Sequence, residues 1–482
     1  MTERERFSVK LVFPPLYKGK PVFIPDTAVP PLGMAVLSGY LRSKGYETEQ
    51  DDLIGMLSPS IPVRDEILGV DSGNVDFLRA QKFLYEGGED KELEEAGRAA
   101  AEKINVEKFT LIGFSVHSRF HFISALIIAR AIRKISSVPI VMGGTFFNYC
   151  RELVRDTFRY ADYIVTGRGE GPMSGLIAFL RQEISSLDDV PGLHIAGKEK
   201  TGELAAAGFS GEENVCPDFN GLDLNKYGIK GLFGRKLWVP YQTSEGCGGA
   251  CSFCVHNMTG PLRFKDNERC LSELRFLKER LGVKNFVFVD STINADPDRL
   301  SSFCERIISS GLKIFWTGTA RASELPFGLL RKMKISGCRR LSFGIESGSK
   351  NILTSANKKL SLSEAEEIIK NSARAGIKTT VCLIAGYPHE KQEDIDASKR
   401  FLERNRRYIH QVNVRIFQLL HSSRIYFDPR GFGVDNLTRT HAFSYAYGFD
   451  EIGGLPWEQK RIQQEDSLRQ INETLERLGY RN

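Results

Sequence analysis

Short apolar segments alternate with helix-like segments along this 482-residue chain, and this alternation constrains the fold more than any other feature. In a first series, the helix predicted at 30–46 has proline at its start and Gly45 near its end, both common helix boundaries. Residues 57–106 form a polar, irregular stretch that we interpret as a largely helical insertion. The strands predicted in this series span residues 7–13, 46–52, 110–116, 139–144 and 163–170. Strands that alternate with helices form parallel sheets, which bind ligands at the carboxyl ends of their strands.

A second alternating series follows a stretch rich in glycine and polar residues. The strands predicted in this second series span residues 237–243, 285–290, 313–319, 340–346, 378–386 and 412–420. Six β–α repeats favour a barrel or a partial barrel, whose chemistry lies at the carboxyl ends of the strands. The apolar spacing of residues 455–482 predicts one amphipathic helix.

The chain is too long for a single hydrophobic core, so we expect more than one domain. We predict an α/β protein with a Rossmann-like domain at 1–200, a linker at 201–236 and a (βα)6 partial barrel at 237–425. A small and mostly helical region at 426–482 completes the chain, and we expect this region to face a substrate.

Composition narrows the classes of partner. Hydrophobic residues make up 41% of the chain and charged residues 26%, which is typical of globular proteins. The formal net charge of +6 is spread along the sequence and does not favour nucleic acid as a partner. The amino terminus has no apolar signal-peptide core, and no apolar run is long enough to span a bilayer. We therefore expect a cytoplasmic protein without a transmembrane segment.

Three of the nine cysteines lie together, and six are scattered. Cys247, Cys251 and Cys254 are spaced C-x3-C-x2-C directly after the first strand of the second series. Three thiolates bind a soft metal, and a 4Fe–4S cluster held by three protein ligands keeps one iron open for a small molecule. Two alternatives are a zinc site completed by an external ligand, and three unligated thiols. The scattered cysteines, which we interpret as small buried apolar residues, are Cys150, Cys216, Cys270, Cys304, Cys338 and Cys382.

The cysteine loop resembles the C-x3-C-x-φ-C motif of the radical S-adenosylmethionine (SAM) superfamily, with Phe253 at the apolar position. The resemblance extends over about residues 237–430 and includes W-T-G-T-A-R (316–321), G-I-E-S (344–347) and L-I-A-G-Y-P-H-E (383–390). It implies a 4Fe–4S cluster whose open iron binds SAM. It also implies one-electron cleavage of SAM to a 5′-deoxyadenosyl radical, with an electron donor such as flavodoxin or ferredoxin.

By position in these motifs, the resemblance implies that Arg321, Ser342, Glu346 and Ser347 contact SAM. For Glu346 the alternative is a helix-capping acid, and for Arg321 it is a surface ion pair. Relatives often have arginine two residues before the first cysteine, where this chain has Glu245. An acid there would lower the reduction potential of a cluster, unless it is paired with a basic residue.

The first domain, over about residues 7–200, resembles the cobalamin-binding domain joined to many radical SAM enzymes. The resemblance rests on residues 30–52, V-M-G-G-T (141–145), G-R-G-E (167–170) and V-P-G-L (190–193). No G-x-G-x-x-G motif follows the first strand, so a dinucleotide is not expected. The residues that the resemblance implies for cobalamin binding are Gly143, Gly144, Gly167 and Glu170. The alternative for the glycines is that they only form tight turns.

None of the eight histidines belongs to an Asp-x-His-x-x-Gly motif, which supplies the cobalt ligand in many cobalamin proteins. We therefore expect no histidine ligation through that motif. His117, on the loop after the third strand, would face the corrin ring if cobalamin binds there. The alternative interpretation is an ordinary polar loop residue.

The two resemblances together imply a cobalamin-dependent radical SAM enzyme, with a C-methyltransferase as the leading hypothesis. It would methylate an unactivated carbon of a small molecule through the 5′-deoxyadenosyl radical and methylcobalamin. Cyclisation, ring contraction or oxidation without methyl transfer is the second hypothesis, and a corrinoid sensor with a structural cluster is the third. Natural products, lipids and tetrapyrroles stay open as substrates, and the aromatic residues of 441–449 either line a substrate pocket or only pack.

Overall fold

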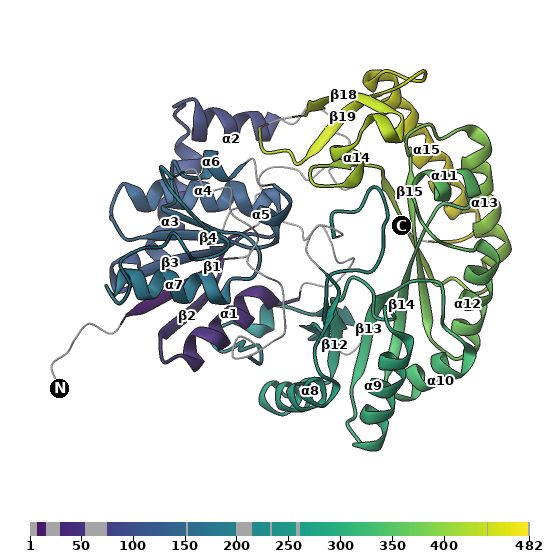
Figure 1. Ribbon diagram of the computed structural model, residues 1–482, viewed down its shortest axis with the longest axis horizontal. Coiled ribbons are helices and arrows are strands. Elements are labelled where there is room, and N and C mark those ends of the chain that lie inside the picture. Colours follow the sequence, from purple (N-terminus) through teal and green to yellow (C-terminus); the bar gives the residue numbers. More distant parts are fainter. Residues whose placement is uncertain are drawn as a thin grey trace. The chain divides into compact units, whose positions relative to one another are not determined.

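The computed structural model describes residues 7–15, 29–53, 75–150, 153–198, 215–231, 234–256, 261–440 and 442–480. The chain divides into two compact units (Figure 1). The first unit comprises residues 1–64, 73–229 and 441–445. The second unit comprises residues 65–72, 230–440 and 446–482.

The first unit contains a six-stranded sheet in the order β2-β1-β3-β4-β5-β6. Strands β1 to β5 are parallel, whereas β6 pairs antiparallel with β5 at the edge. The strands are β1 (Ser8–Phe13), β2 (Glu47–Asp52), β3 (Leu111–Ser115), β4 (Ile140–Gly143), β5 (Tyr163–Val165) and β6 (Leu193–Ile195). The five strands predicted from the sequence are confirmed, and β6 is an addition. Because β2 and β3 flank β1, the strand order reverses between β1 and β3, which is where open α/β sheets bind ligands.

Helices flank this sheet in the first unit (Figure 1). They are α1 (Leu32–Ser43), α2 (Val75–Tyr85), α3 (Lys91–Ile104), α4 (Arg119–Arg133), α5 (Thr145–Tyr149), α6 (Leu153–Thr157) and α7 (Glu170–Leu180). Helices α2 and α3 are the described part of the predicted insertion, and residues 57–74 lie outside the described residues. Asp90 caps α3 by accepting a hydrogen bond from the Leu93 amide. Phe77, Phe83 and Leu93 are buried in the core beside α4, so the insertion is part of the domain.

The second unit contains a six-stranded parallel sheet in the sequential order β9-β12-β13-β14-β15-β16. Its strands are β9 (Val239–Tyr241), β12 (Asn285–Phe288), β13 (Phe315–Ala320), β14 (Cys338–Glu346), β15 (Lys378–Ala385) and β16 (Gln411–Ile416). Its helices are α8 (Asn267–Leu281), α9 (Pro297–Ser309), α10 (Phe327–Ile335), α11 (Lys350–Ser355), α12 (Leu362–Arg374) and α13 (Gln392–Asn405). Strands β9 and β16 lie at opposite edges of this order, which confirms the predicted (βα)6 partial barrel.

The predicted linker is partly built into the first unit. Asp218 donates its amide to the Ala35 carbonyl of α1 at 2.9 Å, and Gln50 donates to the Asp218 carbonyl at 2.8 Å. A Cβ atom on Gly39 would lie 2.6 Å from the Cys216 carbonyl oxygen, so this close approach requires glycine. Two short strands, β7 (Ile229–Gly231) and β8 (Gly234–Lys236), lead into the partial barrel.

The C-terminal region combines the predicted helix with a small sheet that the sequence pattern did not predict. The helix is α15 (Trp457–Arg477), which packs against β15 and β16. The sheet is antiparallel in the order β17-β19-β18, with strands β17 (Leu419–Leu420), β18 (Val434–Arg439) and β19 (Ala446–Glu451). Lys460 of α15 is buried and forms a 2.8 Å ion pair with Glu451 of β19, which fixes helix to sheet. No helix among the described residues is long and apolar enough to cross a membrane.

Candidate functional site

The three clustered cysteines lie on the loop after β10 (Ser244–Glu245), close to the carboxyl end of β9. All three are partly buried and free of disulfides. The amide of Gly249 donates to Cys247 Sγ at 3.4 Å, which folds the loop back on itself. Burial raises the pKa of Cys251, and it raises the pKa of Cys254 to about 11, with a further contribution from the neighbouring sulfurs in both cases. The three sulfurs are therefore close enough to interact electrostatically.

The side chain of Arg321 reaches the cysteine loop from the carboxyl end of β13. It follows β13, and its Nη2 lies 3.5 Å from Cys247 Sγ. A Cβ atom on Gly249 would lie 2.7 Å from the same Nη2, so glycine leaves room for the guanidinium. Asn294 fixes the Arg321 backbone, because its side chain accepts from the Arg321 amide at 2.8 Å and donates to the Arg321 carbonyl at 3.1 Å. A guanidinium held there stabilises a thiolate.

Glu346 is the last residue of β14 and adopts a left-handed backbone conformation with φ of +68°. Its Oε1 lies 3.1 Å from Lys358 Nζ, and both side chains are largely buried. Burial alone would lower the pKa of Lys358, but the charge and hydrogen bond of Glu346 together with the charge of Cys251 outweigh it, and the pKa is raised. A Cβ atom on Gly344 would lie 2.4 Å from Glu346 Oε1, so glycine at this position gives the carboxylate room to fold back. Lys358 also opposes the rise in the pKa of Cys251, so the ion pair belongs to the cysteine site.

The segment after β14 also supports the cysteine loop through its backbone. Asn357 donates its side-chain amide to the Ala250 carbonyl at 2.9 Å, and the Ser252 amide donates to the Ala356 carbonyl at 2.9 Å. The Ser252 hydroxyl lies 2.8 Å from the Tyr387 hydroxyl, on the loop after β15. The loop is therefore held by residues that follow two different strands. Neither Asn357 nor Lys358 was selected from the sequence, because only the fold returns them to the cysteines.

The two predicted serines differ in their surroundings. Ser342 lies within β14, partly exposed, and alternation places it on the same face as Gly344. Ser347 is buried, and its hydroxyl lies 3.2 Å from the Ser398 hydroxyl and accepts from the Ser349 amide. These contacts hold the turn after β14 against α13. The role of Ser347 in SAM binding stays a prediction that its contacts do not support.

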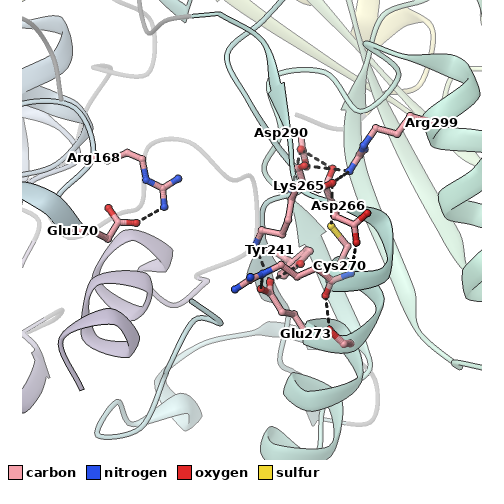
Figure 2. Close-up of polar contacts among 12 residues, drawn as sticks. Arg168, Glu170, Tyr241, Lys265, Asp266, Cys270, Glu273, Asp290 and Arg299 are labelled. Carbon is pink, nitrogen blue, oxygen red and sulfur yellow. Dashed lines mark hydrogen bonds and ion pairs between the residues drawn. The ribbon is translucent and has the colours of Figure 1, made fainter. Parts of the chain in front are cut away.

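A buried polar network supports the strand that leads into the cysteine loop (Figure 2). The Lys265–Glu273 ion pair is 2.7 Å long, and the Tyr241 hydroxyl donates to the same carboxylate at 2.7 Å. These contacts join β9 to α8. Glu245, at the start of the loop, lies opposite Arg263 in the antiparallel pair of β10 and β11 (Arg263–Phe264).

Asp290 is a buried acid that the sequence interpretation did not select. It follows β12, and its Oδ1 accepts from the Thr243 amide at 3.0 Å, the Thr243 hydroxyl at 2.9 Å and the Ser244 hydroxyl at 2.5 Å (Figure 2). Its Oδ2 is buried and has no hydrogen-bond partner among the described residues. Burial raises the pKa of this carboxyl, although the three donors oppose the rise. Asp290 therefore ties β12 to the start of the cysteine loop.

In the first unit, the predicted glycines lie at the carboxyl ends of β4 and β5. Gly143 ends β4, and Gly144 follows with φ of +120°. A Cβ atom on Gly144 would lie 2.3 Å from the Val116 carbonyl oxygen, so no other residue fits without a shift. Gly167 follows β5 with φ of +81°, and its amide donates to the Asn148 side chain at 2.7 Å. Close backbone approach requires glycine at Gly144, and the role of the three glycines in cobalamin binding stays a prediction.

Glu170 begins α7, where it is buried and pairs with Arg168 (Figure 2). The acid therefore has a structural partner within its own turn. Its contact with cobalamin stays a prediction.

The donor chemistry at the two sheet edges fits the expected groups. The second unit offers three interacting thiols beside Arg321 and Lys358, and such cations suit an anionic thiolate-bound cluster. The first unit offers glycine turns at a point of reversed strand order, where the backbone leaves room for a large ligand. Among the described residues, no group of three or more His, Cys, Asp or Glu side chains is arranged around a single metal ion. The assignment of the three thiols to a cluster stays a prediction.

Comparison with protein families gives two matches. Residues 241–402 match the radical SAM superfamily, and residues 89–177 match the B12 binding domain. The chain is 28% identical over 286 residues to an uncharacterized methyltransferase of Pyrococcus horikoshii, covering 58% of this chain and 61% of that protein. It is 24% identical over 278 residues to an anaerobic magnesium-protoporphyrin IX monomethyl ester cyclase of Cereibacter sphaeroides, covering 56% of this chain and 45% of that protein.

A solved structure shares the fold over nearly the whole chain. It is that of the cobalamin-dependent SAM radical enzyme OxsB with aqua-cobalamin and SAM bound. The TM-score is 0.71 at 16% identity, and the match covers 98% of this chain and 67% of that chain. A radical SAM domain takes a 4Fe–4S cluster with SAM, and a B12 binding domain takes cobalamin, so these are the cofactors that the two matched domains imply for this protein. The chain therefore contains one region similar to the radical SAM superfamily and another similar to the B12 binding domain.

Proposed function

We propose that this protein is a cobalamin-dependent radical SAM C-methyltransferase that acts on an unactivated carbon of a small molecule. The observation that carries the proposal is the pairing, in one chain, of a B12 binding domain with the three-cysteine loop at the carboxyl edge of a partial barrel. The name of the Pyrococcus horikoshii relative favours methyl transfer. The chain spans 61% of the length of that relative, so the activity of the whole protein is a proposal.

The residues that would hold the cluster are Cys247, Cys251 and Cys254, with Arg321 beside them. SAM carries an ammonium and a carboxylate, and the Glu346–Lys358 pair offers one group of each charge next to the cysteines. Each can exchange its present partner for the opposite charge of SAM, which avoids leaving a buried charge unpaired. Ser342 lies on the same strand as Glu346 and would extend this polar surface.

When bound, the cluster with SAM supplies a hydrogen-abstracting 5′-deoxyadenosyl radical, and cobalamin supplies a transferable methyl group. The chain positions these groups and keeps water away from them. The burial of Cys254 and Glu346 indicates such a dry site. Reduction of the cluster would require a donor such as flavodoxin or ferredoxin. We place the reaction in the cytoplasm, where the nine cysteines would stay reduced.

Cyclisation is the second candidate function. It is favoured by the similarity to the anaerobic magnesium-protoporphyrin IX monomethyl ester cyclase, which is 24% identical to this chain over 278 residues. The residues near the cysteines serve either outcome, because both begin with the same radical. The mass of the product separates the two: methylation adds one CH2 group, and cyclisation does not.

The experiment is anaerobic reconstitution of the full chain with iron, sulfide and cobalamin, followed by turnover with methyl-labelled SAM and a candidate extract of natural products, lipids and tetrapyrroles. Label recovered in a small molecule is the expected result. SAM cleavage with no label in any product would favour cyclisation or oxidation. No SAM cleavage under reducing conditions would contradict both enzymes and favour a corrinoid sensor.

A further inference from the structure

Tyr387, on the loop after β15, touches the cysteine loop with its hydroxyl. The residue is buried, and its hydroxyl lies 2.8 Å from that of Ser252, which follows Cys251 in the chain. The Tyr387 hydroxyl also donates to the Ser355 carbonyl at 3.2 Å, at the end of α11. The Ser252 hydroxyl reaches the same carbonyl only at 3.4 Å, so the phenol is its closer partner. The phenol ring packs edge-on against Phe417 with centroids 4.9 Å apart, and this packing does not depend on the hydroxyl.

Ser252 lies between two of the predicted cluster ligands, so its position sets the path of the chain from Cys251 to Cys254. Its backbone is held from two sides. The amide donates to the Ala356 carbonyl at 2.9 Å, and the carbonyl accepts from the Ile425 amide at 3.2 Å. The side chain is fully buried, so its hydroxyl must find a partner within the protein. The phenol described above supplies that partner.

The C-terminal helix α15 fixes the backbone of Tyr387. Lys460 of this helix is buried and donates to the Tyr387 carbonyl at 2.7 Å, and Gln464 donates to the Gly386 carbonyl at 3.0 Å. The Gly386 amide donates to the side chain of Glu390 at 2.8 Å, which closes the turn after β15. A Cβ atom on Gly386 would lie 2.4 Å from the Gln464 side chain, so helix and loop are in close contact. Because the loop is fixed on this side, the phenol hydroxyl has a defined position against the cysteine loop.

We propose that Tyr387 is a positioning residue of the cluster, and that its hydroxyl, by holding Ser252, brings the sulfurs on either side of that serine to the same cluster. The inference rests on the cluster of the proposed function. Groups outside the ligand shell of a metal commonly orient its ligands, and the loss of one lowers metal affinity by about 10- to 100-fold. Burial and the smaller contribution of the Cys251 charge raise the pKa of Tyr387 to about 12, against the opposing hydrogen bond of Ser252, so the phenol keeps its proton at pH 7.

The test measures iron release from the anaerobically reconstituted full chain, with a ferrous chelator as the probe. Tyr387→Phe keeps the ring and loses the hydroxyl, and we expect it to release iron about 10- to 100-fold faster than the wild-type chain. The paramagnetic spectrum of its reduced cluster should also change, because the geometry of the cysteine ligands changes. A residue that only packs would leave this spectrum unaltered.

Tyr480→Phe is the matched control. Tyr480 is a buried tyrosine of the same unit, and its hydroxyl lies 3.4 Å from the carbonyl oxygens of Arg406 and Ile409, which are outside the cysteine loop. We expect iron release and the spectrum to stay unchanged in this variant. Equal acceleration in Tyr387→Phe and Tyr480→Phe would mean that the loss of any buried hydroxyl loosens the unit, and it would overturn the inference.

A double-variant cycle tests whether the two hydroxyls act as one pair. Ser252→Ala should accelerate iron release as Tyr387→Phe does, and the double variant should be no faster than either single variant. Additive accelerations would overturn the inference, because the hydroxyls would then act separately. If Tyr387→Phe fails to fold, unchanged release in Ser252→Ala overturns the inference on its own.

The wild-type chain separates this inference from the proposed function. Iron uptake by the wild-type chain with unchanged release in Tyr387→Phe would overturn the inference and leave the proposed function intact. A wild-type chain that takes up no iron would overturn both.

Discussion

The carboxyl edges of the two parallel sheets carry different chemistry. In the second unit the edge is built from charged side chains and thiols, with Arg321 at Cys247 and Glu346 at Lys358. In the first unit the edge near β3 and β4 is built from glycine turns and neutral imidazoles, with Gly144 and His117 as the central residues. An anionic 4Fe–4S cluster and zwitterionic SAM require protein side chains of the opposite charge. The large corrin ring of cobalamin requires space. The same sheet architecture therefore offers two unlike environments for ligands through the residues that follow its strands.

The largest effect is expected from removing one thiol of the second unit. Cys251→Ala would lose the iron-dependent absorption, and SAM cleavage would fall by more than about 100-fold, since even partners outside the ligand shell contribute up to about that factor. The measurement is iron content and 5′-deoxyadenosine formation after anaerobic reconstitution. Cys304→Ala is the matched control, because this thiol is buried in α9 and should leave both values unchanged. Retention of the full iron signal in Cys251→Ala would disprove the cluster assignment.

A smaller effect is expected when the charge pair is broken and the thiols are kept. Glu346→Gln should raise KM for SAM by about 10- to 100-fold, the range of a lost charge-assisted hydrogen bond. Iron absorption should not change, which separates SAM binding from cluster binding. Glu305→Gln serves as the control, since Glu305 pairs with Lys332 on the surface. An unchanged KM in Glu346→Gln would show that Glu346 only neutralises Lys358.

The edge of the first unit should respond to added volume. Gly144→Ala combines a positive φ with a clash against Val116, and we expect a loss of about 1–3 kcal/mol of unfolding free energy together with weaker cobalamin retention. Gly45→Ala is the control, because Gly45 also has a positive φ but no atom within 4 Å of an added Cβ. Thermal unfolding and the retained cobalamin absorption measure the two effects. Equal losses in both variants would mean that close approach at Gly144 is unimportant.

Acid should weaken the first unit through its buried imidazole. Burial lowers the pKa of His121 to about 3 from the ordinary value of 6.5, so between these values the unfolded chain binds more protons and acid favours unfolding. Its contribution amounts to about 2 kcal/mol between pH 7 and pH 5. His121→Gln should remove about half of the pH dependence of Tm that the two imidazoles cause over this interval, because His117, whose pKa burial lowers to about 4, keeps the other half. Asp290 in the second unit has the opposite sign, because burial raises its pKa and the folded chain then binds more protons than the unfolded chain as the pH falls.

The sequence predicted the regular elements better than the contacts between them. Strand β3 is a buried apolar run, and strand β14 alternates between buried and more exposed residues; either pattern marks a strand whatever its neighbours are. Strand β6 was missed because it has three residues and pairs antiparallel at an edge. The strands β18 and β19 were missed because their polar faces obscure the alternation of buried residues.

The side-chain contacts around the cysteine loop could not be predicted from the spacing of residues in the sequence, because the fold brings the partners together. Lys358 is twelve residues from Glu346, and only the turn through α11 brings their charges together. Arg321 was selected through its motif, but its approach to Cys247 is set by Asn294 and by the space at Gly249. The sequence left two roles open for the aromatic residues of 441–449, which either line a substrate pocket or only pack in the core. Phe443 and Phe449 are buried in hydrophobic cores, which favours packing for these two residues.

Phe443 has a consequence for how the chain is made. It belongs to the core of the first unit, with ring centroids 5.3 Å from Tyr85 and 6.3 Å from Phe122, although more than three hundred residues separate it from those partners. During translation, the core of the amino-terminal domain therefore stays incomplete until Phe443 has been synthesised. A fragment ending at residue 229 would emerge with a phenylalanine-sized hole, and we expect it to need chaperones or to precipitate.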